Sequence, residues 1–128
     1  MGERGIAIYP NTVREFREGV DRAIRYAKAL GCSQLHCLAG LAPVGAEHRT
    51  LRKAYLENLS FAAHALADEG LTLLIEPINT RDIPTYFLDT TAKAVDIIES
   101  VGAPNLHLQY DVYHMQIMEG DLARTIER

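Results

Sequence analysis

Leu71–Asn79 reads LTLLIEPIN, an apolar run that ends in an acid and a proline. A strand buried on both faces of a sheet reads as such a continuous apolar run. The carboxylate of Glu76, at the far end of this run, is costly to bury unless something there needs a negative charge. A second stretch, Leu106–His114 (LHLQYDVYH), repeats the arrangement, with Asp111 as the acid that follows the apolar part. We therefore expect two strands, each with an acid at its carboxyl end.

Helical patterns alternate with these strands. Three stretches carry apolar residues at three- and four-residue spacing: 12–30, 47–69, and from 89 or 90 to 101. A short strand over 34–38 and a fourth helix after Gly120-Asp121 complete the order α-β-α-β-α-β-α. Strands that alternate with helices form a parallel sheet through right-handed crossovers. Three strands and about four helices over residues 1–128 therefore predict one α/β domain, either an open three-layer piece or about half of a (β/α)8 barrel.

Composition limits the class of protein. The chain has 128 residues, 48% of them hydrophobic and 23% charged, which is typical of a globular domain with a core. A net charge of −4 without a basic block argues against a nucleic-acid partner. No apolar run approaches the roughly 20 residues of a membrane span, and the first residues lack the features of a signal peptide. We expect no membrane partner and a cytoplasmic protein, in which Cys32 and Cys37 are buried thiols.

The two acids are expected to meet. Side chains alternate along a strand, so if Glu76 and Asp111 point to the interior of a barrel, the apolar residues beside them face the helices. The two positions are 111 − 76 = 35 residues apart, which is one βα unit, so the strands should be neighbours. Ligands bind at the carboxyl ends of such strands. Two carboxylates about 4.8 Å apart can share one divalent cation, with Mg²⁺ or Mn²⁺ favoured by all-oxygen ligands.

Other polar residues near these acids are weaker candidates. His114 follows the second acid by three positions, and the loop after the first acid holds Asn79, Arg81 and Asp82 as candidates for substrate contact. A single acid at a strand end is more often a helix cap or a salt-bridge partner, and polar loop residues are usually solvated. His36, inside a strand, is interpreted as a histidine of the core.

Three segments resemble the hydroxypyruvate isomerase family: ALGCSQLHCLAG (29–40), IEPINTRDIPTYFLDT (75–90) and PNLHLQYDVYHMQIMEGDL (104–122). That family belongs to the xylose-isomerase-like TIM-barrel sugar isomerases and epimerases. The resemblance runs over the whole chain, which is similar to about the middle half of a full-length member. It implies a (β/α)8 TIM barrel and interconversion of hydroxypyruvate with 2-hydroxy-3-oxopropanoate (tartronate semialdehyde).

The resemblance also implies roles for individual residues. Glu76 matches the family's metal-binding glutamate, which is also a proton donor and acceptor. Asp111 matches the next metal ligand, and His114 matches the histidine that touches a substrate oxygen. The family adds a third ligand, Gln or His, and a second catalytic glutamate on the two strands that follow. Those strands lie outside these 128 residues, so we do not expect activity from the 128 residues alone.

Three alternatives stay open on sequence grounds. One is a 2-oxo-tetronate isomerase or another small sugar isomerase or epimerase of the same fold. Another is a metal-dependent phosphodiesterase or AP endonuclease, which shares the barrel but is disfavoured by the net charge and by the EPIN motif. The third is a catalytically incomplete piece whose exposed sheet edges favour pairing with a second copy.

Overall fold

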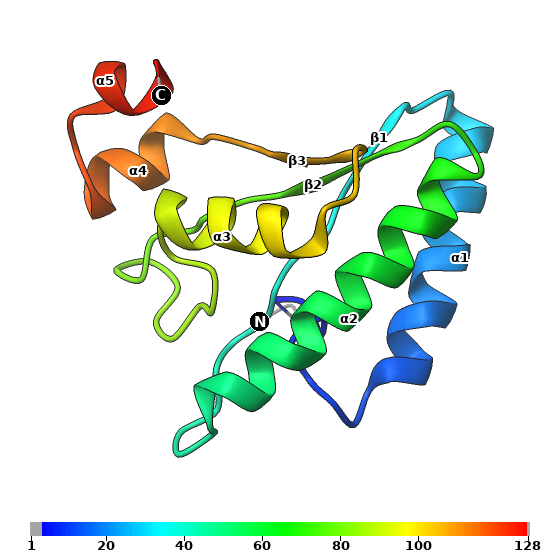
Figure 1. The fold of residues 1–128 in the computed structure, drawn as a ribbon, viewed down its shortest axis with the longest axis horizontal. Helices are drawn as coiled ribbons and strands as arrows, with labels where there is room; N and C mark the ends of the chain where they lie inside the picture. Colours follow the sequence, from blue (N-terminus) through cyan, green and yellow to red (C-terminus); the bar gives the residue numbers. More distant parts are fainter. Residues whose placement is uncertain (1–3, 128) are drawn as a thin grey trace.

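The computed structural model describes residues 4–127 and contains a three-stranded parallel sheet in the order β1-β2-β3 (Figure 1). Its strands are short: β1 (Gln34–His36), β2 (Thr72–Ile75) and β3 (Leu106–Leu108). Leu73 of the central strand pairs with Leu35 on one side and with Leu106 on the other. A helix connects each strand to the next, as parallel pairing requires. The parallel α/β architecture expected from the sequence is confirmed.

Three long helices occupy the three predicted helical stretches: α1 (Val13–Leu30), α2 (His48–Ala67) and α3 (Thr91–Val101). Gly31 and Gly102 follow α1 and α3 with a φ of 67°, a left-handed conformation that glycine adopts without steric cost. Thr90 caps α3, because its hydroxyl accepts a hydrogen bond from the backbone N–H of Lys93. Within residues 4–127, each helix is too short or too polar to cross a membrane.

The two faces of the sheet differ in what covers them. Helices α2 and α3 lie on one face (Figure 1), and Leu73, Ile75 and Leu106 are buried there. Strand register and side-chain alternation place Gln34 and His107 on the opposite face, and both are exposed. No helix of the described part of the chain covers that face (Figure 1). Burial alternates along β2, with Leu73 and Ile75 toward the helices, which confirms the predicted side-chain directions. Glu76 follows Ile75, so its side chain points toward the opposite face.

Residues 4–127 contain five helices, so the prediction of about four was one helix short. Leu106–His114 is not one strand: β3 ends at Leu108, and α4 (Val112–Met118) begins directly after Asp111. The carboxylate of Asp111 accepts a hydrogen bond from the backbone N–H of Tyr113, which starts this helix. The helix expected after Gly120-Asp121 is α5 (Leu122–Ile126). Figure 1 places α4 and α5 beyond the carboxyl end of β3.

The two cysteines lie in different surroundings. Cys32 is exposed in the turn between α1 and β1, so the expectation of a buried thiol was wrong for this residue. Cys37 directly follows β1 and packs against the core, and burial raises the pKa of its thiol to about 12. Both cysteines are free thiols.

Candidate functional site

Glu76 lies at the carboxyl end of β2, where the strand gives way to Pro77. Its side chain is buried, with 7% of the residue exposed. One carboxylate oxygen, Oε2, is 3.4 Å from Nε2 of His36, and the other, Oε1, is 4.0 Å from Nε2 of His114. A buried carboxylate is costly unless a positive charge or hydrogen-bond donors compensate it. Glu76 is thus held at the expected edge of the sheet between two imidazole rings.

Asp111 reaches the same place from the neighbouring strand. Its Oδ1 accepts a hydrogen bond of 2.8 Å from the backbone N–H of Tyr113 at the start of α4. Its Oδ2 is 3.9 Å from Nε2 of His114. Asp111 therefore combines two roles that were considered from the sequence, a helix cap and a carboxylate of the site. One oxygen caps α4, and the other points into the site.

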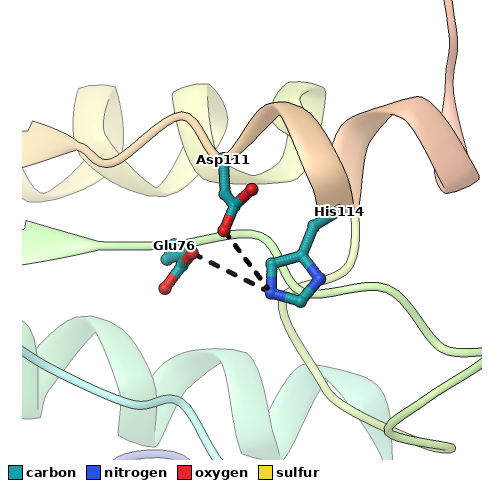
Figure 2. A group of neighbouring side chains, drawn as sticks. All are labelled: Glu76, Asp111 and His114. Carbon is teal, nitrogen blue, oxygen red and sulfur yellow. Dashed lines mark ion pairs between the residues drawn. The ribbon is translucent and has the colours of Figure 1, made fainter.

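Glu76, Asp111 and His114 converge on one point (Figure 2). Each offers a ligand atom, and these atoms lie within 4.8 Å of one another. Among residues 4–127, neither carboxylate pairs with a lysine or an arginine. Carboxylate oxygens are the ligands that hard divalent cations prefer. The donor set fits a divalent cation.

Two of the three candidate residues in the loop after Glu76 take part in this cluster. Asn79 is fully buried, and its Nδ2 is 2.8 Å from Nδ1 of His114 and 3.0 Å from Oδ2 of Asp82. The backbone N–H of Asp82 donates to Oδ1 of Asn79 at 2.8 Å. Arg81 lies between them and is exposed. The structure therefore brings Asn79 to His114 and Asp82 to Asn79, whereas it leaves the side chain of Arg81 on the surface of the loop.

Tyr113 completes this network and was not a candidate from the sequence. Its hydroxyl donates a hydrogen bond of 2.6 Å to Oδ2 of Asp82. The hydrogen bonds from Tyr113 and then from Asn79 lower the pKa of the Asp82 carboxyl. The same bond to Asp82 raises the pKa of the Tyr113 phenol. Asp82 is therefore an ionised acceptor of two hydrogen bonds.

His36 was read from the sequence as a core histidine, but the structure places it against Glu76. Burial is the main cause that lowers the pKa of His36, and the charge of Glu76 opposes this effect. His36 pairs in register with Leu74, two residues before Glu76, so both side chains have the same parity in the sheet. Side-chain alternation could have indicated the contact of His36 with Glu76 from the sequence, but only with knowledge of the register between β1 and β2.

A family model described as a xylose isomerase-like TIM barrel matches residues 4–128. The chain belongs to the xylose isomerase-like TIM barrel family. The strand-end position of Glu76 and Asp111 agrees with this membership, since functional residues of such barrels lie at the carboxyl ends of the strands.

Two named relatives match this chain at about 50% identity, each over about half of its own length. The chain is 50% identical to hydroxypyruvate isomerase of Escherichia coli over 98% of its own length and 48% of that protein. It is 49% identical to 2-oxo-tetronate isomerase of Cupriavidus necator over 99% of its own length and 49% of that protein. The resemblance noted from the sequence motifs is confirmed.

Solved structures give the same picture of the fold. A crystal structure named AP endonuclease, family 2, from Brucella melitensis matches with a TM-score of 0.95 and 44% identity, covering 98% of this chain and 48% of that one. A D-allulose 3-epimerase from Methylomonas sp. matches with a TM-score of 0.78 and 28% identity, covering 92% and 42%. The chain spans about half the length of the curated relatives it matches.

Proposed function

We propose that this chain contributes to an isomerase that interconverts hydroxypyruvate and 2-hydroxy-3-oxopropanoate. The convergence of Glu76, Asp111 and His114 at the carboxyl edge of the sheet is the observation that carries the proposal. The names of the relatives support a small hydroxy-oxo acid as the substrate class. The cytoplasmic location and the absence of nucleic-acid and membrane partners stay predictions from the sequence.

The reaction moves one proton between adjacent carbons. A base removes a proton from the hydroxymethyl carbon of hydroxypyruvate, which gives an enediolate. The proton is returned to the neighbouring carbon, and the hydroxyl proton passes from one substrate oxygen to the other. General acid–base transfer by a positioned carboxylate is suited to both proton steps.

Glu76 is the residue of this chain that we assign to the proton transfer. Its carboxylate is shielded from solvent, since only 7% of the residue is exposed. His114 would contact a substrate oxygen through Nε2, which faces the two carboxylates. Direct substrate contact by Asn79, Arg81 and Asp82 stays a prediction. The second catalytic glutamate implied by the family would come from outside the 128 residues.

Glu76 and Asp111 are the residues that would hold the cation, and Mg²⁺ or Mn²⁺ fits their oxygen atoms. When bound there, such a cation supplies electrostatic stabilisation of negative charge that develops on the substrate oxygens. The chain's own contribution is to hold both carboxylates at one point and to keep His114 directed at them.

The test uses the full-length gene product with Mg²⁺ or Mn²⁺ in deuterated water. Turnover of hydroxypyruvate with deuterium incorporated at carbon supports the proposal, because the enediolate exchanges its proton with solvent. Glu76→Gln should abolish this exchange, whereas Glu57→Gln, which changes an exposed acid on α2, should not. Turnover of a 2-oxo-tetronate but not of hydroxypyruvate would favour the alternative that the Cupriavidus necator relative suggests. Lack of turnover of both substrates would refute the proposal.

A further inference from the structure

The two ring nitrogens of His114 face different groups. Nε2 faces the carboxylates of Glu76 and Asp111 at 4.0 and 3.9 Å. Nδ1 faces Asn79, with the side-chain Nδ2 at 2.8 Å and the backbone N at 3.4 Å. Which nitrogen carries the proton decides whether Nε2 is a hydrogen-bond donor or a lone-pair ligand.

The orientation of the Asn79 amide is fixed by Asp82. The backbone N–H of Asp82 can only donate, so the Asn79 atom 2.8 Å from it must be the carbonyl oxygen Oδ1. The other amide atom is therefore Nδ2, which donates one proton to Oδ2 of Asp82 at 3.0 Å and directs the other to His114. The opposite orientation would place an oxygen against the Asp82 carboxylate and an N–H against an N–H.

Both groups at Nδ1 of His114 are thus donors, since the backbone N–H of Asn79 cannot accept. We infer that Asn79 is a positioning residue that keeps the lone pair of His114 on Nδ1 and its proton on Nε2. Tyr113 supports this arrangement, because its hydroxyl bond keeps Asp82 in place as the acceptor for Asn79.

This tautomer sets the chemistry of His114 in the site. An Nε2–H cannot bind a cation through a lone pair, so His114 is a hydrogen-bond donor beside a cation site made by Glu76 and Asp111. Separations of 3.9 and 4.0 Å are too long for hydrogen bonds to those carboxylates, which leaves the N–H available for a substrate oxygen. The catalytic consequence rests on the proposed function, whereas the tautomer itself does not.

The tautomer can be measured without turnover by long-range proton–nitrogen spectra of the full-length gene product, metal-free and labelled with ¹⁵N-histidine. His114→Gln identifies the signals of His114. The expected wild-type spectrum shows an unprotonated Nδ1 and a protonated Nε2. A protonated Nδ1, or an equal mixture of the two tautomers, would overturn the inference without any measurement of activity.

Two variants with the same side-chain types test the role of Asn79. The exchange Asn79→Asp with Asp82→Asn replaces the donor facing Nδ1 by an acceptor, so Nδ1 should become protonated. Asp82→Asn alone keeps the backbone N–H that orients Asn79, so the wild-type pattern should persist. An unchanged tautomer in the double variant would refute the role of Asn79.

Activity provides a separate readout. In the double variant, kcat for hydroxypyruvate should fall by about 10- to 100-fold, the usual loss when an outer-shell partner of a site is changed. A wild-type protein that shows the Nε2–H tautomer but does not turn over the substrate would refute the proposed function and leave the tautomer established. A double variant with the altered tautomer and unchanged kcat would refute the positioning role.

Discussion

Nε2 of His36 lies 3.4 Å from Oε2 of Glu76, so the carboxylate is flanked by a histidine from the neighbouring strand. Burial lowers the pKa of His36 and the charge of Glu76 opposes this effect, so burial favours a neutral ring beside the Glu76 carboxylate. We expect His36→Ala to weaken Mn²⁺ binding by about 10- to 100-fold, as loss of an orienting partner usually does. Calorimetric titration of the full-length gene product measures this affinity. His64→Ala, on the exposed face of α2, is the control and should bind Mn²⁺ as the wild type does.

Asp111 allows its two roles to be separated by two substitutions. Asparagine keeps an oxygen that can accept the hydrogen bond from Tyr113, whereas alanine removes it. Both Asp111→Asn and Asp111→Ala should reduce Mn²⁺ affinity by about tenfold or more, since each removes a carboxylate ligand. Only Asp111→Ala should also lower the free energy of unfolding, by about 0.5–2 kcal/mol, the usual cost of losing a helix cap. Equal stability losses in urea unfolding would contradict the capping role.

Removal of the Tyr113 hydroxyl should raise the pKa of Asp82. The hydrogen bond from Tyr113 is the largest cause of the lowered pKa, so Tyr113→Phe should move the pKa back toward the ordinary aspartate value of 3.8. A carboxyl whose pKa is lowered by folding stabilises the folded state above pH 3.8, and this contribution is lost as the pH falls through the folded-state pKa. Carbon-detected NMR titration of the Asp82 carboxyl measures the shift. An unchanged pKa in Tyr113→Phe would show that this hydrogen bond does not form in solution.

The two thiols should differ in reactivity. Thiolate is the reactive form, and burial that raises the pKa of Cys37 to about 12 leaves it almost wholly protonated at pH 8. Cys32 is exposed and should react with iodoacetamide first. Peptide mass spectrometry of the native protein should find label on Cys32, and label on Cys37 should appear after unfolding in urea. Labelling of Cys37 at the rate of Cys32 in the native state would contradict the burial of this thiol.

The meeting of Glu76 with Asp111 was predictable from the sequence because both acids follow the carboxyl ends of neighbouring parallel strands. Because the apolar residues Leu73 and Ile75 of β2 face the helices, the side chain of Glu76 must point to the opposite face of the sheet. One βα unit separates Glu76 from Asp111. The start of α4 was missed for a local reason. The alternation of LHLQYD continues past Leu108, and only the hydrogen bond that the Tyr113 N–H donates to the Asp111 carboxylate shows where the helix begins.

The contacts of His114 needed the folded structure. Asn79 and His114 are separated by 35 residues, and no local pattern indicates that the loop after β2 reaches α4. The same holds for His36, since its approach to Glu76 depends on the register between β1 and β2. Sequence patterns thus predicted which acids meet, whereas the hydrogen bonds that orient their neighbours arise only from tertiary packing.

The helical layer that supports the site should be sensitive to truncation of its core. Leu59 lies in α2 and is fully buried, so Leu59→Ala removes apolar contacts and leaves a cavity. We expect the free energy of unfolding to fall by about 2–5 kcal/mol, the range for buried leucines. Leu30→Ala makes the same chemical change at a residue that is 74% exposed, and it should alter stability by less than about 0.5 kcal/mol. Urea unfolding of both variants in the full-length gene product measures the difference. Comparable losses in the two variants would contradict the packing of α2 against the sheet.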